Sequence, residues 1–294
     1  MVLKNRWGFV KVRLWLVVVV LGQAWSQGAM GQGLTAIDFY NRGLDLLDAR
    51  DFNGALASFS QAASLNPQDP DIFYNRGYIH HLLGQIPEAI ADYARTLTLD
   101  PNYAYAYGNR CYGNYQIEAY NQALQDCNQA LNLEPGNGNF RFHRGNVNYK
   151  LQNYVAAIED YNFSFQTTSP TAELHINRGN AYDDLGQPTQ AIADYTDAIL
   201  KEPKNGRAYS NRALAYYRLG QYEQALNDHN TAITLDQTRP ETYVNRAITH
   251  YRLERGANAA ADLNIAIDLF KQKQQWSEVS KAEQLLAFIT NPKP

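Results

Sequence analysis

The hydrophobic positions of the chain recur at helical spacing, and short polar breaks interrupt them at regular distances. In one period, residues 71–83 carry apolar side chains three to four positions apart, and residues 87–99 do so again. Glycine and glutamine at 84–85 break the first run, and the Asp-Pro pair at 100–101 ends the second. The pattern predicts two antiparallel helices joined by a tight turn.

This helix pair returns every 34 residues, and four columns of residues keep the same phase. The first helix carries an asparagine column followed directly by an arginine column, which comprises Arg42, Arg76, Arg110, Arg144, Arg178, Arg212 and Arg246. The second helix carries an aspartate column, which comprises Asp92, Asp126, Asp160, Asp194, Asp228 and Asp262. It also carries an alanine column at Ala55, Ala89, Ala123, Ala157, Ala191, Ala225 and Ala259. Seven periods in phase predict a stacked array, because one helix pair cannot bury its apolar face alone.

The array occupies most of the chain. We expect seven repeats at residues 36–69, 70–103, 104–137, 138–171, 172–205, 206–239 and 240–273. Residues 274–290 place apolar side chains on one helical face, which predicts a helix that caps the exposed end of the array. Residues 27–35 are rich in glycine and glutamine and are expected to be flexible, and residues 291–294 form a tail.

The N-terminus has a different pattern. Residues 1–26 contain four basic residues, no acidic residue and an apolar run at 14–21. The run is shorter than the roughly 20 apolar residues that span a bilayer, so it indicates an export signal. We expect cleavage after Ser26 and an exported protein, in the periplasm or the thylakoid lumen. An uncleaved N-terminal anchor is the alternative, and it is the one membrane contact that we expect.

The rest of the chain is acidic, which limits its partners. The whole sequence holds 26 Lys and Arg against 29 Asp and Glu, and 22 against 29 remain without residues 1–26. Nucleic acids and anionic lipids require a basic surface, so we expect neither as the main partner.

The period, the helix–turn–helix pattern and the small, aromatic and proline positions resemble the tetratricopeptide repeat family over residues 36–273. The Asn-Arg-Gly motif and the Ala-Ile-Ala-Asp-Tyr motif at 89–93 and 191–195 are similar to those of cyanobacterial tetratricopeptide proteins. The resemblance implies an all-α, right-handed superhelical solenoid of seven repeats with a C-terminal capping helix. Proline is missing from the usual closing position at Ser169, Gln237 and Lys271, where we expect less regular joints.

The resemblance also implies which positions line the concave groove. One of them holds Asn41, Asn75, Asn109, His143, Asn177, Asn211 and Asn245. This column resembles the asparagine ladder of the O-GlcNAc transferase superhelix, whose amides hold the main chain of an extended peptide. An amide suits this role because it offers both a donor and an acceptor. The alternative is that each asparagine bonds its own neighbouring helix and fixes the repeat spacing.

Tyrosines supply the second set of candidate peptide-binding residues. They are Tyr74, Tyr78, Tyr112, Tyr115 and Tyr149. Protein interfaces favour tyrosine because it gives a large contact area at a low entropy cost. We expect some of these rings to pack between repeats instead.

The arginine and aspartate columns have a structural interpretation. Within one repeat the arginine lies eight residues before the turn and the aspartate eight after it, so antiparallel helices bring them to one level. We expect ion pairs inside each hairpin, such as Arg76 with Asp92, Arg110 with Asp126, and Arg178 with Asp194. A basic ridge for phosphate is the alternative, which the aspartates argue against.

The two cysteines, Cys111 and Cys127, occupy core positions at matching levels of one hairpin. A disulfide between them is plausible in an oxidising compartment, and two packed thiols are the alternative. We expect no metal site, because His143 is not at a zinc-binding spacing from either cysteine.

The repeats leave no room for a catalytic domain, and the chain has no phosphate-binding loop, nucleophile elbow or metalloprotease motif. We therefore expect no enzyme, no cofactor and no small-molecule substrate. The interpretation is an exported protein–protein interaction scaffold or assembly factor that holds an extended polypeptide in its groove. The alternative is a passive structural subunit of an envelope or thylakoid-lumen complex, docking by its convex face or edges.

Overall fold

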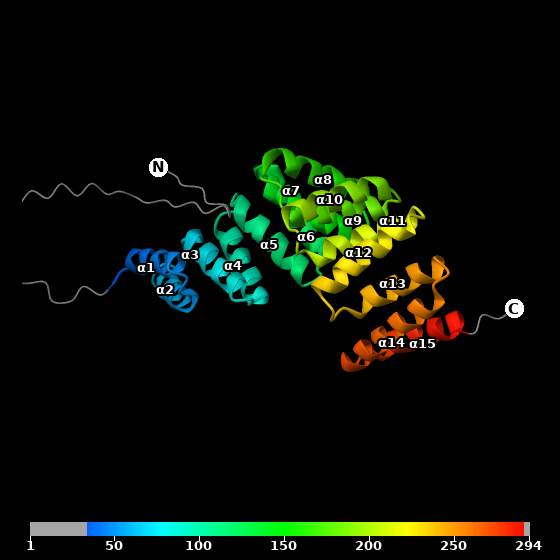
Figure 1. Cartoon of the computed structure of the whole chain (residues 1–294). Helices are drawn as coiled ribbons and strands as arrows, with labels where there is room; N and C mark the ends of the chain where they lie inside the picture. The colour runs from blue at the N-terminus through cyan, green and yellow to red at the C-terminus, as the bar shows by residue number, and fades with distance from the viewer. Residues whose placement is uncertain (1–33, 291–294) are drawn as a thin grey trace, which may run out of the picture. The chain divides into compact units, whose positions relative to one another are not determined.

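The computed structural model describes residues 34–290, and these residues form fifteen α-helices and no β-strand (Figure 1). The expected signal segment 1–26, residues 27–33 and the tail 291–294 lie outside the described residues. The all-helical fold expected from the periodicity is confirmed for the described part of the chain. None of its helices is long and apolar enough to cross a membrane.

Fourteen helices form seven consecutive pairs, and one further helix follows. The pairs are α1 (Ala36–Asp48) with α2 (Phe52–Leu65), α3 (Pro70–Leu82) with α4 (Ile86–Leu99), α5 (Ala104–Gln116) with α6 (Tyr120–Leu133), α7 (Gly138–Lys150) with α8 (Tyr154–Thr167), α9 (Ala172–Asp184) with α10 (Pro188–Lys201), α11 (Gly206–Arg218) with α12 (Tyr222–Leu235), and α13 (Pro240–Arg252) with α14 (Gly256–Gln272). The last helix is α15 (Trp276–Thr290).

The sequence fixes the helix ends through local hydrogen bonds and backbone preferences. In the second pair, the Asp69 side chain accepts a hydrogen bond from the Asp71 amide, and proline occupies the first turn of α3. The turn to α4 passes through Gly84, whose φ of +74° is a left-handed conformation that costs glycine little. Four other repeats place a non-glycine residue there with a similar φ: Arg50, Glu118, Gln152 and Glu254.

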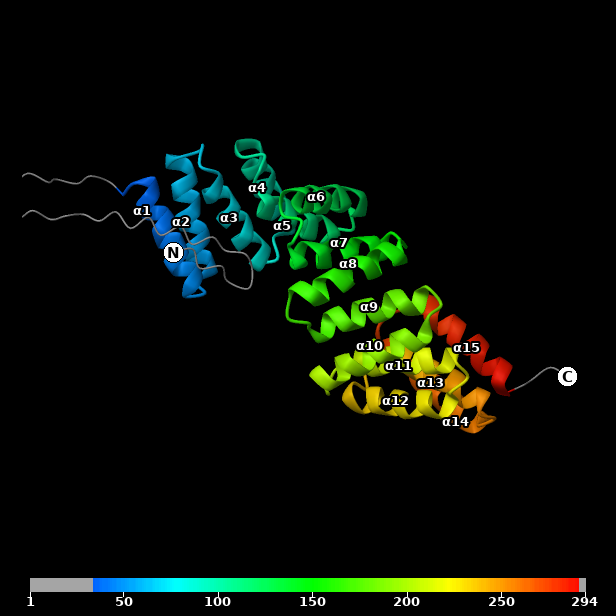
Figure 2. The ribbon, with the colours of Figure 1, turned by 90° about the horizontal axis from the view of Figure 1, so that it is seen from above.

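The helices gather into two compact units. Unit 1 contains α1–α6, within residues 34–135, and unit 2 contains α7–α15, within residues 136–290. Inside each unit every helix packs against the next along the chain (Figure 2). The first helices of successive repeats also touch: α3 with α5 in unit 1, and α7 with α9, α9 with α11, and α11 with α13 in unit 2. We call the face formed by the first helices of a unit its first-helix surface, and the opposite face its second-helix surface.

A small residue on the first helix faces a large ring on the second in four repeats. Gly43 lies against Phe59, Gly77 against Tyr93, Gly145 against Tyr161, and Gly179 against Tyr195. A Cβ atom at Gly145 would lie 2.6 Å from a carbon of the Tyr161 ring, which is closer than packed atoms approach. The small-residue column therefore exists because the helices of each pair close tightly over an aromatic side chain.

The last helix, α15, packs on α14 in unit 2. It buries Val279, Ala282 and Ile289 in one cluster with Leu263 and Phe270 of α14. These contacts cover the apolar face that the seventh pair would otherwise leave exposed.

Candidate functional site

The asparagine column connects successive repeats in unit 1. The Asn75 side chain is only 6% exposed, and its Nδ2 donates to the Tyr40 hydroxyl at 3.1 Å and to the Asp71 carbonyl at 2.8 Å. In the next repeat, Asn109 Nδ2 donates to the Tyr74 hydroxyl at 3.2 Å. Each amide thus joins its own first helix to the one before it.

Unit 2 uses the same column with a different acceptor. Asn177 Nδ2 donates to Asn146 Oδ1 at 3.0 Å, and Asn211 Nδ2 donates to Asn180 Oδ1 at 2.8 Å. The same amide oxygen of Asn146 accepts from the Tyr161 hydroxyl at 2.9 Å. These bonds tie the first helices to each other and to the ring inside the hairpin.

Four of the seven column residues therefore bond the preceding repeat, which is a spacing role. The alternative interpretation expected each asparagine to bond its own neighbouring helix, whereas these four donate to a residue of the preceding repeat. Asn41 is exposed, whereas His143 and Asn245 are half-buried. Contact of this column with a bound peptide stays a prediction, which applies best to the partly exposed Asn109, Asn177 and Asn211.

Tyr74 does not offer the contact surface that the sequence predicted. Its side chain is 3% exposed, it packs against Tyr93 and Tyr103, and its hydroxyl accepts from Asn109. Burial raises the pKa of this phenol far above its usual value. Tyr74 is therefore core between repeats, because the large ring fills the space that two small-residue helices leave between them.

The other predicted tyrosines of unit 1 lie partly exposed on its first-helix surface, as Tyr78, Tyr112 and Tyr115 do. His81 of α3 stacks on Tyr112 of α5, with ring centroids 5.0 Å apart and planes 9° apart. Tyr112 and Tyr115 are also nearly parallel, at 6.4 Å and 14°. Tyr120, at the start of α6, continues the series at 6.0 Å from Tyr115. We call His81, Tyr112, Tyr115 and Tyr120 the aromatic row.

Sequence reasoning did not assign His81 or Tyr120 to the site. The available signal was the repeat register, because His81 occupies the same position as Tyr115 and Tyr149 one and two periods later. Burial is the main cause that lowers the pKa of His81, so its imidazole is neutral at neutral pH. His81 therefore adds no positive charge to the row, in which His81, Tyr112 and Tyr115 are nearly parallel and Tyr120 is tilted by 56° to Tyr115.

In unit 2 the positions equivalent to Tyr115 hold Tyr149, Asp183 and Tyr217, and each of these side chains has a polar or charged partner. The Tyr149 hydroxyl donates to Asp184 Oδ2 at 2.6 Å, Arg218 forms an ion pair with Asp183, and Arg252 Nε donates to the Tyr217 hydroxyl at 2.9 Å. Burial raises the pKa of Asp183, and Arg218 opposes that shift in part. Tyr149 is half-buried, and its hydroxyl is held by Asp184 at the end of α9.

The arginine and aspartate columns form the ion pairs that the register predicted. Arg76 Nε donates to Asp92 Oδ2 at 2.8 Å and its second terminal nitrogen to Asp92 Oδ1 at 2.6 Å. The same two-pronged geometry joins Arg110 to Asp126, Arg144 to Asp160, Arg178 to Asp194, Arg212 to Asp228, and Arg246 to Asp262. The aspartates are buried and the guanidinium groups are partly exposed, so the columns hold the hairpins closed.

Cys111 and Cys127 form a disulfide between α5 and α6, with their Cα atoms 5.3 Å apart. Both residues are fully buried. They stand where neighbouring hairpins place a glycine and a tyrosine, so a covalent bond replaces the ring contact in the third repeat.

A possible metal-binding group lies in unit 2, where His175, Asp194 and Asp197 come together. His175 Nδ1 lies 3.2 Å from Asp194 Oδ1, but both oxygens of Asp194 already accept from Arg178. The group is therefore an extension of the ion pair, and its carboxylate is not available as an open ligand.

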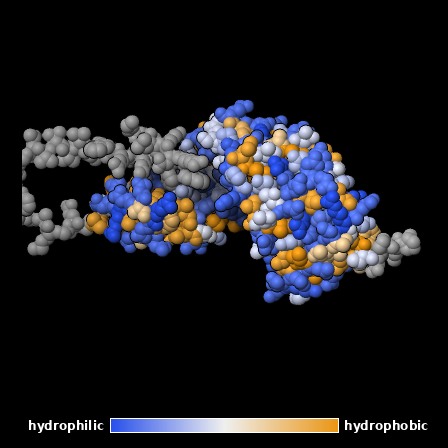
Figure 3. Space-filling model, in the orientation of Figure 1, coloured by the Kyte–Doolittle hydropathy of each residue, from blue (hydrophilic) through white to orange (hydrophobic). Residues whose placement is uncertain are grey.

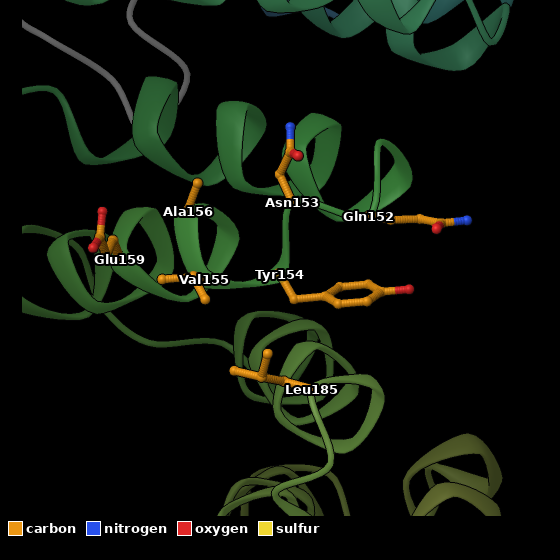
Figure 4. Close-up of a pocket in the computed structure, with 7 residues that line it drawn as sticks. All are labelled: Gln152, Asn153, Tyr154, Val155, Ala156, Glu159 and Leu185. Carbon is orange, nitrogen blue, oxygen red and sulfur yellow. The ribbon is translucent and has the colours of Figure 1, made fainter.

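A shallow pocket of about 430 Å³ lies where the start of α8 meets the end of α9 (Figure 4). Apolar side chains Val155 and Leu185 face each other there, and Glu159 is the one carboxylate among the lining residues. The pocket brings together no nucleophile with a base, so its lining gives no support to catalysis.

Two segments match the tetratricopeptide repeat family, residues 40–104 and residues 176–240. One of these segments lies in unit 1 and the other in unit 2. No curated protein matches the chain significantly. The similarity to a cyanobacterial subgroup stays a prediction.

Solved structures share the fold. A tetratricopeptide repeat protein from Parabacteroides merdae is 21% identical, with a TM-score of 0.62 over 88% of this chain and 100% of that one. The Cut9–Hcn1 hetero-tetramer of APC/C has a TM-score of 0.63 and 16% identity, and the match covers 84% of this chain and 52% of that one. The C-terminal part of a tetratricopeptide repeat protein from Cytophaga hutchinsonii has a TM-score of 0.59 and 14% identity, and the match covers 78% of this chain and 95% of that one. At such identities the similarity concerns the fold alone.

Proposed function

We propose that the protein is an exported interaction scaffold that binds an extended segment of a partner polypeptide on the first-helix surface of unit 1. The observation that carries this proposal is the half-exposed row of rings in unit 1, which runs from α3 across α5 to the start of α6. His81 and Tyr115 occupy the same position in successive repeats, and Tyr112 and Tyr120 of the third repeat lie beside them, so an extended chain could contact several rings at once.

Two further features support the proposal. Asn109, Asn177 and Asn211 use an N–H group within the array, but each side chain is still partly exposed on the first-helix surface of its own unit. One of the proteins with the same fold, Cut9, forms a hetero-tetramer with Hcn1, so the fold is compatible with a stable protein complex. Export rests on the pattern of residues 1–26.

A second candidate is a structural subunit that docks through its second-helix surface or an edge. It is favoured by the exposed Val155, at 58%, and Leu185, at 37%, which border the pocket of unit 2. Elsewhere the visible surface alternates hydrophilic and hydrophobic residues without one dominant apolar area (Figure 3).

Site-specific photo-crosslinking distinguishes the two candidates without removing a structural contact from the core. A benzophenone amino acid is placed at Tyr112 in one variant and at Val155 in another, and intact cells are irradiated. We expect a partner adduct from position 112 and none from position 155. The reverse result supports docking by the other face, and adducts from neither position contradict both proposals.

Export has its own test. N-terminal sequencing of the protein from the extracytoplasmic fraction should give Gln27 as the first residue. An intact Met1 in that fraction supports the uncleaved anchor, and a protein found only in the cytoplasm contradicts export.

A further inference from the structure

The two units differ sharply in charge. Residues 34–135 of unit 1 contain five arginines, no lysine and 12 acidic residues, which gives a net charge of −7. Residues 136–290 of unit 2 contain 16 basic and 17 acidic residues, which gives −1. A negative potential that attracts cations is therefore concentrated on the unit that carries the aromatic row.

The arginines of unit 1 do little to neutralise its surface. Arg76 and Arg110 are engaged by the buried Asp92 and Asp126. Subtracting these two pairs leaves three arginines against ten acidic residues. The acidic excess thus belongs to groups outside the ion pairs that close the hairpins.

The aromatic row has the geometry of a cation-binding platform. The faces of tyrosine rings attract ammonium and guanidinium groups, and this attraction is larger where water is partly excluded. Two of its tyrosines, Tyr112 and Tyr115, are nearly parallel and partly exposed, and the stacked imidazole of His81 adds no positive charge that would repel a cation. Glu118 lies at the end of the row, because its carbonyl accepts from the Tyr120 amide at 2.9 Å and the residue itself is exposed.

The chain itself already uses this type of contact. Arg178 lies 3.9 Å from the centre of the Phe165 ring, and Arg141 lies 4.6 Å from that of Phe163, both in unit 2. In unit 1, Arg76 and Arg95 lie against Phe73, and Arg110 lies against Tyr107.

We infer that the aromatic row of unit 1 binds lysine or arginine side chains of a basic, extended partner segment, with the acidic surface of unit 1 attracting that segment. The inference rests on the proposed function and specifies the partner class for the same surface. An acidic segment would be repelled by the charge of unit 1, and an uncharged segment would gain nothing from it.

The test measures binding of the full chain to three fluorescent serine-rich peptides by anisotropy. The peptides are identical except at spaced positions, which hold lysine, glutamine or glutamate. We expect the lysine peptide to bind, the glutamine peptide to bind more weakly and the glutamate peptide not to bind. Added salt should weaken lysine binding, because it screens the charge of unit 1.

Substitutions then locate the site. Tyr112→Leu combined with Tyr115→Leu removes two ring faces but keeps apolar bulk, and it should weaken lysine binding roughly fivefold to thirtyfold. The matched control is Tyr251→Leu, which changes the residue at the position of Tyr115 in the last repeat and should leave binding unchanged. Tyr112→Phe with Tyr115→Phe keeps both ring faces and should retain binding. This second variant can still be interpreted if the leucine variant does not fold.

The possible results separate this inference from the proposed function. Equal binding of lysine and glutamine peptides, lost in the leucine variant, overturns the charge preference and leaves the proposed surface intact. Lysine binding that survives both leucine substitutions overturns the location. Binding of none of the three peptides, together with adducts at position 112 in cells, overturns the basic partner alone. Absence of both peptide binding and adducts overturns the proposed function as well.

Discussion

At the residue scale, His229 is unusual for its position. Four repeats place Phe59, Tyr93, Tyr161 or Tyr195 at the corresponding point of the second helix, and the sixth repeat places a fully buried histidine there. Neither ring nitrogen of His229 has a hydrogen-bond partner among the described residues. Burial first, and then the nearby charges of Arg246 and His250, lower its pKa to about 4 from 6.5.

This shift predicts a loss of stability in mild acid. The unfolded chain binds the proton near pH 6.5 and the folded chain only near pH 4, so stability is complete above pH 6.5 and falls as the pH decreases between these values. The loss at pH 5 should be about 2 kcal/mol. His229→Phe should remove this part of the pH dependence, which denaturant unfolding at pH 7 and pH 5 would reveal. An equal pH dependence in both proteins contradicts the prediction.

The ion pairs give a second prediction at this scale. Asp160 is 2% exposed and accepts from both Arg141 and Arg144. Asp160→Ala leaves two partly buried guanidinium groups without their common carboxylate and should lower the free energy of unfolding by about 3 kcal/mol. The control is Glu159→Ala on the exposed side of the same helix, which should change it by less than about 0.5 kcal/mol. Equal effects in urea titrations would show that the pair is not structurally important.

At the element scale, the third hairpin joins its helices by a bond that the others lack. The Cys111–Cys127 disulfide closes a loop with a sequence separation of 16 residues. Reduction should therefore lower the stability of this hairpin by about 3 kcal/mol. Hydrogen-exchange protection of α5 and α6 with and without reductant measures the effect.

The repeat register supplies the matched control for this bond. Cys111→Gly with Cys127→Tyr installs the pair that the second, fourth and fifth repeats use. This variant should keep the protection of α5 and α6 and should be insensitive to reductant. If wild-type protection is equally insensitive, the disulfide adds nothing to the hairpin.

The sequence predicted the helix pairs well, but it did not predict the role of each side chain. Residues 71–83 and 87–99 were expected to be helical, and α3 and α4 span Pro70–Leu82 and Ile86–Leu99. Periodicity determines such elements because helix spacing and the Gly84 turn are local. It does not determine which group a side chain bonds across repeats. Asn75 donates a hydrogen bond to the phenol of Tyr40, whereas Asn177 donates to the amide oxygen of Asn146. Tyr112 and Tyr115 of the aromatic row were predicted as contact residues, but His81 and Tyr120 were missed for the same reason, because ring stacking depends on side-chain rotamers.

At the scale of the whole molecule, the uneven charge should make the two units respond differently to salt. Like charges in unit 1, at −7, repel one another and destabilise its folded state, whereas unit 2, at −1, has little such repulsion. Both units contain arginine–aspartate pairs whose carboxylates are buried, and salt screens such partly buried pairs less than exposed charges. Raising sodium chloride from low to physiological strength should therefore increase hydrogen-exchange protection more in unit 1 than in unit 2. Peptides from both units are measured in one sample, so unit 2 is the internal control. Equal gains would mean that the acidic residues of unit 1 are spaced too widely to repel one another. The attraction of a basic partner would then depend on the carboxylates beside the aromatic row, such as Glu118, rather than on the charge of the unit.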